Sequence, residues 1–137
     1  MRKIISITMV LLLTLTAFNV NAAKPKKTIV PKVEVYYFHF THRCVTCQAV
    51  ETETLKALPA LYPKLFKAKK ITFTSVNLDE KSSEPIALKC NAEGQSLIII
   101  GNGKRIDLTE QGFMYARSKP EKLKIELESV IDLLLKK

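Results

Sequence analysis

Residues 33–47 read VEVYYFHFTHRCVTC, and they join two stretches of different character. The first stretch, Val33 to Phe40, is rich in β-branched and aromatic residues, which predicts a buried β-strand. Its continuous apolar character is typical of a central strand that is covered on both faces. The second stretch contains Cys44 and Cys47, and we expect a helix to begin near Cys44. The two cysteines therefore lie at a predicted junction between a strand and a helix.

The residues after this junction repeat with the period of a helix. Apolar and small side chains recur on one face, at the positions Val50, Thr54, Ala57, Leu58 and Leu61. Proline lacks the backbone N–H, and its ring clashes with the preceding turn. We therefore expect Pro59 and Pro63 to kink or break this helix.

The rest of the sequence predicts two further helices and three further strands. They are a strand over Ile71–Leu78, a short helix over Pro85–Lys89, a strand over Leu97–Ile100, its hairpin partner over Lys104–Leu108, and a last helix from Pro120 to the end. The first two strands are joined through a helix and should be parallel with a right-handed crossover. We predict an α/β fold of order βα-β-α-ββ-α, with helices on both faces of a four-stranded mixed sheet.

The N-terminus has the pattern of a secretory signal peptide. Arg2 and Lys3 form a basic start, and an almost wholly apolar run follows from Ile4 to Phe18. Small residues at 20–22 then supply a cleavage site. The apolar run is shorter than the ~20 residues that a membrane span needs. We predict cleavage after Ala22, with a retained N-terminal anchor as the alternative.

This interpretation divides the chain into three parts and predicts where it acts. Residues 1–22 are the signal peptide, residues 23–32 form a basic tether, and residues 33–137 form one domain. We expect an exported protein, which is periplasmic if the source has two membranes.

The charge balance is basic, but it does not indicate a nucleic-acid ligand. The formal net charge of +9 falls to +7 once Arg2 and Lys3 are removed. A positive excess favours anionic surfaces in general, yet the lysines are scattered along the sequence and indicate a soluble basic surface. We expect a monomer without a cofactor, without a nucleic-acid partner and without a membrane span after processing.

The cysteine pair carries the predicted chemistry. The free N–H groups and the dipole of a helix N-terminus stabilise an anion, so the pKa of Cys44 should fall below the usual thiol value of ~8.5. Arg43 and His42 would add positive charge beside the thiolate. Cys47 lies one helical turn later on the same side. Cys44 is the predicted nucleophile and Cys47 the predicted resolving thiol, which act by thiol–disulfide exchange.

Two other roles for the pair remain open. A structural disulfide would constrain little of the unfolded chain, because the loop between the cysteines is so short. A metal carrier would use both cysteines, and a closed zinc site would need two more ligands, for which His39, His42 and Cys90 are available. We predict no metal site. Cys90 is the odd thiol, and we expect it to be buried and inert, with an intermolecular link or a third redox role as alternatives.

Three segments resemble the thioredoxin-like superfamily. They are VEVYYFHFTHRCVTCQAVE, ITFTSVNLDE and GQSLIIIGNGKRIDL, and the resemblance covers the chain from Val33 to Lys137. It implies a thioredoxin fold and thiol–disulfide exchange, with Cys44 as nucleophile and Cys47 as resolving cysteine. Together with the predicted signal peptide, this makes an exported thiol–disulfide oxidoreductase the leading hypothesis. It also implies partners: envelope proteins that contain thiols or disulfides, and a second redox protein.

The sequence departs from the thioredoxin pattern at five positions around the pair. Arg43 replaces the usual aromatic residue, and residues 45–46 are Val-Thr instead of Gly-Pro. Phe38 aligns with the buried acid, and Gln95 aligns with the cis-proline that faces the disulfide in thioredoxins. The Gln95–Ser96 bond should be trans, because a cis bond without proline costs ~3 kcal/mol. These changes motivate an alternative function as a non-catalytic thioredoxin-like binding module.

Overall fold

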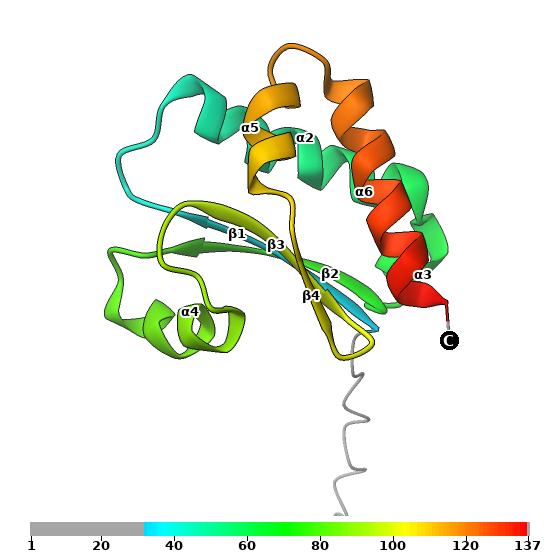
Figure 1. The fold of residues 1–137 in the computed structure, drawn as a ribbon, viewed down its shortest axis with the longest axis horizontal. Coiled ribbons are helices and arrows are strands. Elements are labelled where there is room, and N and C mark those ends of the chain that lie inside the picture. The colour runs from blue at the N-terminus through cyan, green and yellow to red at the C-terminus, as the bar shows by residue number, and fades with distance from the viewer. Residues whose placement is uncertain (1–31, 137) are drawn as a thin grey trace, which may run out of the picture.

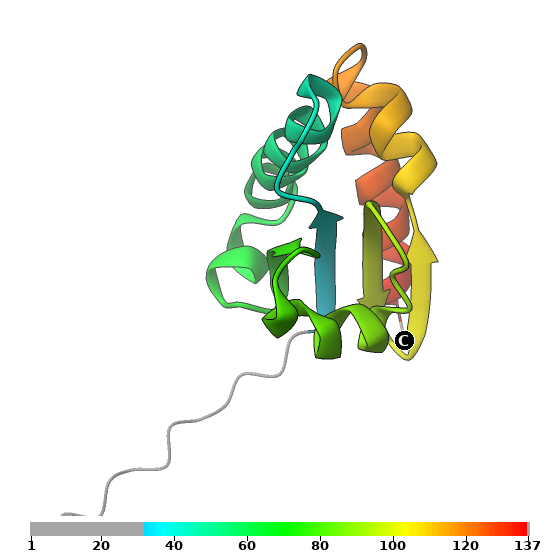
Figure 2. The same ribbon diagram turned by 90° about the vertical axis from the view of Figure 1, so that its left-hand side faces the viewer.

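The protein is built on a single mixed β-sheet. A computed structural model describes residues 32–136, so the predicted signal peptide and residues 23–31 of the predicted tether lie outside the described residues. The sheet has four strands in the order β2-β1-β3-β4, and Figure 2 shows them side by side. The predicted α/β architecture is confirmed.

The strands pair as the sequence predicts. The central strand β1 (Val33–His39) is parallel to β2 (Ile71–Asn77) and antiparallel to β3 (Ser96–Gly101), which is antiparallel to β4 (Lys104–Asp107). Phe40 is exposed and lies just beyond β1. Because β1 has a hydrogen-bonded neighbour on each side, its end is a fixed point from which the next helix begins.

Within residues 32–136, five α-helices and one 3-10 turn surround this sheet. They are α2 (Val45–Leu61), α3 (Pro63–Lys67), the turn η1 (Lys81–Ser83), α4 (Glu84–Cys90), α5 (Thr109–Tyr115) and α6 (Pro120–Leu135). Helices α2, α5 and α6 lie on one face of the sheet, and α4 lies on the other (Figure 1). None of the helices in residues 32–136 has both the length and the apolar character to cross a bilayer.

Alternate residues of β1 contribute to two separate cores. Val33, Val35 and Tyr37 join the larger core, which helices α2 and α6 cover. Tyr36 and Phe38 face the opposite way and join a smaller core with Cys90 at the end of α4. This alternation is the period-two pattern of a strand that is buried on both faces.

Two expectations about the helices need correction. Pro59 does not break the first helix, because it lies inside α2, two residues before its end; only Pro63 marks a break, and it opens α3. Helix α5 was not predicted, because Gly112 at its centre disfavours a helix. The space beside Gly112 explains the glycine: a Cβ there would lie 3.3 Å from side-chain atoms of Val50 and Leu97.

Candidate functional site

The loop that leads from β1 to the cysteines is held in place by hydrogen bonds. The Thr41 N–H donates to Asp79 Oδ2 at 2.7 Å, and Asn77 donates through Nδ2 to the Thr41 hydroxyl at 3.0 Å. Asn77 is the last residue of β2, the parallel neighbour of β1, and Asp79 follows it by two residues. The carboxyl ends of two adjacent strands therefore fix where α2 begins.

Cys44 lies at the N-cap of α2, as predicted. Its backbone is extended (φ −75°, ψ 167°), and its sulfur accepts a hydrogen bond from the Cys47 N–H at 3.4 Å. The Sγ atoms of Cys44 and Cys47 are 2.7 Å apart. Cys44 is exposed, whereas Cys47 is buried. The structure thus brings together an accessible sulfur and a shielded one that is within reach of it.

The surroundings shift the pKa values of the two thiols in opposite directions. The hydrogen bond from Cys47 and the backbone N–H groups at the start of α2 lower the pKa of Cys44. Burial raises the pKa of Cys47, and its hydrogen bond to Cys44 raises that pKa further. Near neutral pH the exposed sulfur is therefore the better anion, and the buried sulfur retains its proton.

Gln95 contacts the buried sulfur. Its Oε1 accepts a hydrogen bond from Cys47 Sγ at 3.4 Å, and no peptide bond in residues 32–136 is cis, so the Gln95–Ser96 bond is trans as expected. A thiol that donates to this oxygen is stabilised in its protonated form. The side chain at the cis-proline-equivalent position is thus a polar neighbour of Cys47.

The two residues expected to tune the thiolate, Arg43 and His42, lie in different surroundings from each other. Arg43 pairs through its guanidinium with Glu51, and the His42 side chain is exposed in the loop. A tuning role for Arg43 and His42 stays a prediction.

A polar group beside Cys47 was missed by the sequence analysis. Burial would raise the pKa of Glu51, but hydrogen bonds from Ser75 and Arg43 outweigh burial and lower it. Tyr37 is fully buried, and its hydroxyl has no hydrogen-bond partner within the described residues. Glu51 was detectable in principle, because it follows Cys47 by one helical turn.

The position predicted to match the buried acid faces away from the cysteines. Phe38 belongs to the smaller core on the α4 face, whereas Tyr37 faces α2. Burial raises the pKa of Tyr37, and Cys47 is close enough to raise that pKa further. Tyr37, rather than Phe38, is the β1 side chain on the same face of the sheet as α2 and Cys47.

The other candidate ligands are not brought to the cysteine pair. Cys90 is buried in the smaller core, on the face of the sheet opposite α2. His39 is nearly buried, and its Nδ1 lies 2.9 Å from the Phe40 carbonyl oxygen. Between residues 32 and 136, no three histidine, cysteine, aspartate or glutamate side chains are grouped so that they could hold a metal ion.

The sheet order and the cysteine at the start of the helix after β1 define the class: the protein has a thioredoxin-like fold. Solved structures similar to this chain include one described as that of a malarial protein (23% identity, TM-score 0.47, covering 76% of this chain and 98% of that one). Another is mitochondrial thioredoxin 3 from Saccharomyces cerevisiae in its oxidised form (21% identity, TM-score 0.46, covering 76% and 80%). No protein-family model matches the chain, and no curated protein is significantly similar to it.

Proposed function

We propose that the protein is an exported thiol–disulfide oxidoreductase that uses Cys44 and Cys47 as its redox pair. The observation that carries this proposal is the 2.7 Å approach of the two sulfurs at the start of α2. One sulfur is exposed with a lowered pKa, and the other is buried with a raised pKa. This division matches the two roles that disulfide exchange requires.

The exchange proceeds in two balanced steps. The Cys44 thiolate attacks one sulfur of a substrate disulfide, so that a mixed disulfide forms and the other substrate sulfur leaves as a thiolate that takes up a proton. Cys47 then loses its proton and attacks Cys44 Sγ, which releases the second substrate thiol. The substrate disulfide is reduced to two thiols, and Cys44 and Cys47 are oxidised to one disulfide. The reverse sequence oxidises a substrate dithiol.

The environment of Cys47 supports the second step. Cys47 retains its proton in the resting state because burial and the bond to Cys44 raise its pKa. Once Cys44 is bonded to a substrate sulfur, the hydrogen bond between Cys47 and Cys44 is lost. The Cys47 thiolate then becomes easier to form. Cys47 therefore stays protonated until Cys44 has formed the mixed disulfide.

A trapping experiment tests this function. The variant Cys47→Ser should accumulate a mixed disulfide through Cys44 with an envelope protein that contains a disulfide, because the resolving thiol is missing. The matched control, Cys44→Ser, should accumulate none. Separation of the exported fraction on a non-reducing gel, followed by mass spectrometry of the linked peptide, identifies the bond.

The same experiment distinguishes the alternatives. A binding module without redox chemistry would give no covalent adduct with Cys47→Ser, and the wild-type pair would exchange with glutathione no faster than an unstructured peptide dithiol. A metal carrier would bind Cu(I) in a 1:1 ratio and lose it in either single variant. Either result, together with the lack of an adduct, would overturn the proposed function.

A further inference from the structure

The fold gathers lysines that are scattered in the sequence. The Lys32 N–H donates to the Lys70 carbonyl oxygen at 2.8 Å, and Lys69 precedes Lys70 in the turn before β2. Lys104 pairs with Gly101 across the β3–β4 hairpin, next to Asn102, whose side chain donates to the Lys136 carbonyl oxygen at 3.2 Å. Because Gly101 is also the register partner of Val33, these contacts place all the lysines at one end of the sheet. We call Lys32, Lys69, Lys70, Lys104 and Lys136 the basic end.

Within residues 32–136, the basic end carries an excess of positive charge, which the Asp132 carboxylate offsets only in part. The segments that form it, residues 63–71, 101–104 and 135–136, contain neither aspartate nor glutamate. Glu34, near the start of β1, is paired with Lys89 at 2.9 Å. Asp132, one turn before Lys136, accepts a hydrogen bond from the Tyr62 hydroxyl at 2.6 Å. Four of the five lysines are exposed, and Lys70 is half-buried.

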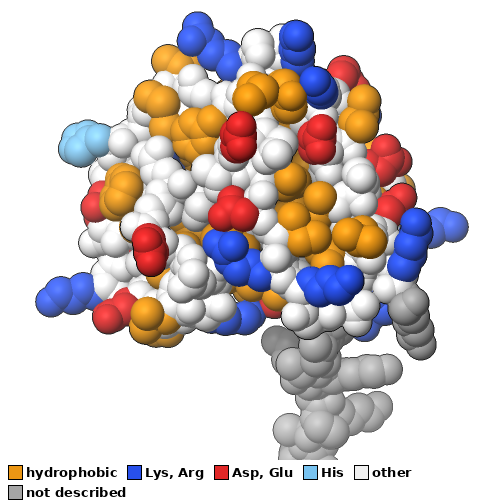
Figure 3. Space-filling model, in the orientation of Figure 1, with side chains coloured by type: hydrophobic (Ala, Val, Ile, Leu, Met, Phe, Trp, Pro, Cys, Tyr) orange, Lys and Arg blue, Asp and Glu red, His pale blue; other side chains and the backbone are white. Residues whose placement is uncertain are grey.

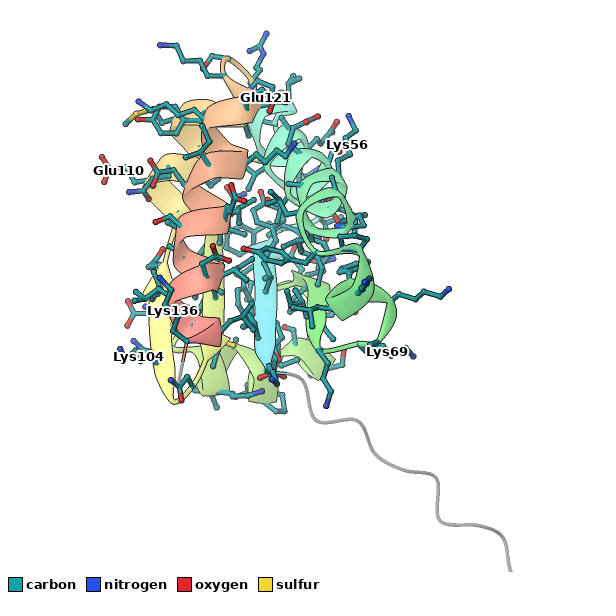
Figure 4. All side chains as sticks on the ribbon, turned by 90° about the vertical axis from the view of Figure 1, so that its right-hand side faces the viewer. Lys56, Lys69, Lys104, Glu110, Glu121 and Lys136 are labelled. Carbon is teal, nitrogen blue, oxygen red and sulfur yellow. The ribbon has the colours of Figure 1, made fainter. Side chains whose placement is uncertain are left out.

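The basic end lies opposite the cysteine pair. Figure 4 shows Lys69, Lys104 and Lys136 at one end of the domain and Lys56 and Glu121 at the other. In Figure 3, lysine and arginine side chains line the lower right rim of the same surface. Strand β1 begins beside Lys32 and ends next to the loop that leads to Cys44. Its seven residues separate the two ends by about 20 Å.

We propose that the basic end docks on an anionic phospholipid surface. The segment that precedes the domain joins it here, at Lys32, and its sequence from residue 24 to residue 32, KPKKTIVPK, adds three more lysines. This part of the inference rests on the proposed export, which would release the domain beside a bilayer. Docking at this end holds Cys44 on the side away from the bilayer.

The chemistry of the basic end favours a lipid surface over a shaped protein partner. Lysine is a flexible point charge that responds to a diffuse negative potential, whereas specific carboxylate or phosphate recognition uses the fork of arginine. Each lysine near an anionic bilayer contributes about 1 kcal/mol, or roughly a factor of five, to binding at low salt. The inference is independent of the redox chemistry, because neither cysteine takes part in it.

Vesicle binding tests the proposal. The protein used is the chain from residue 23 onward, which retains every described contact of the fold. It should co-sediment with vesicles that contain phosphatidylglycerol and remain free with vesicles of phosphatidylcholine alone. The triple variant Lys69→Gln, Lys104→Gln and Lys136→Gln should bind about 100-fold more weakly at low salt. A control with the same loss of charge, Lys56→Gln, Lys81→Gln and Lys119→Gln, should bind as the wild type does.

Each result counts for or against the basic end. Equal binding to both kinds of vesicle, or no binding to either, would overturn the proposal. Equal weakening in both triple variants would overturn it as well, because net charge and not the basic end would then control binding. Alkylation of Cys44 should be as fast on vesicles as in solution, and a slower reaction would contradict the proposed orientation. Thermal unfolding of each variant confirms that it is folded.

Discussion

The side-chain amide of Gln95 provides an acceptor for the thiol of Cys47, and this contact has a measurable effect on redox balance. Oε1 lies 3.4 Å from the sulfur and stabilises the dithiol state, in which Cys47 has a proton to donate. Gln95→Met keeps the length of the side chain but removes the acceptor. We expect the reduction potential of the pair to fall by about 10–30 mV, as measured by equilibration with glutathione.

Gln95→Glu is the matched variant. It keeps an oxygen at the same distance from the backbone, so the potential should stay at the wild-type value or rise. Equal potentials for the methionine and glutamate variants would show that the contact with Cys47 has no thermodynamic role.

The pH dependence of Cys44 alkylation follows from its hydrogen bonds. Only the thiolate reacts, so the lowered pKa of Cys44 places the midpoint of the rate profile below that of a free cysteine and leaves more thiolate at neutral pH. Cys47→Ala removes the largest cause of the lowered pKa, while the backbone N–H groups remain. The midpoint should therefore rise but stay below that of a free cysteine, in a series of iodoacetamide rates from pH 5 to pH 10. Cys90→Ala should leave the profile unchanged, and a profile of Cys44 that is unaffected by Cys47→Ala would contradict this account.

Sequence reasoning located the cysteines but not their neighbours. The position of Cys44 at a helix start follows from local patterns, since a strand-like run ends only a few residues earlier. The contact between Cys47 and Gln95 joins residues 48 positions apart and depends on how β3 lies beside β1. The pairing of Arg43 with Glu51 depends on a loop conformation that no periodicity encodes.

Close packing of β3 against the start of β1 predicts that Gly101 tolerates no side chain. A Cβ at this position would lie 2.9 Å from the Lys32 carbonyl oxygen and 3.2 Å from Leu134 Cβ. Gly101→Ala must shift the backbone, and we expect it to lower the free energy of unfolding by about 1–3 kcal/mol in urea denaturation. Gly94→Ala is the control, because a Cβ there would meet nothing within 4 Å. Equal stabilities of the two variants would contradict the packing argument.

The helices differ in how far local sequence patterns predict them. All four strands and the helices α2, α4 and α6 have local sequence signatures, such as apolar runs, a helical period or a hairpin turn. Helix α5 lacks such a signature, since its central Gly112 is needed for contact with α2 and β3 rather than for helix formation. Pro59 also departs from its local signal, because α2 continues through it to Leu61.

The two faces of the sheet are unequal, and the stability of the domain should be unequal with them. The α2–α6 face has fifteen buried core residues, and the α4 face has five. Regions with few buried contacts open at lower free energy than the core does. We expect the amide protons of α4 to exchange faster than those of β1 and α6 in native-state hydrogen exchange. Protection in α4 equal to that in α6 would show that the domain opens as one unit.

Variants on each face separate local from global opening. Leu127→Ala, in the larger core, should lower the free energy of unfolding by about 2–5 kcal/mol and reduce protection in every element. Ile86→Ala lies on α4 and should accelerate exchange in α4 alone. A loss of protection in β1 or α6 with Ile86→Ala would contradict the separation of the two faces.

The position of Cys90 has a consequence for how the chain matures under oxidising conditions. The sheet stands between this thiol and the other two cysteines, so Cys90 cannot form a disulfide with either of them in the folded domain. A disulfide that includes Cys90 can therefore form only while α4 is not packed against the sheet. The fraction of molecules in which Cys90 reacts with a maleimide would thus measure how often α4 does not cover the sheet. Cys90 therefore reports on incomplete folding of this face.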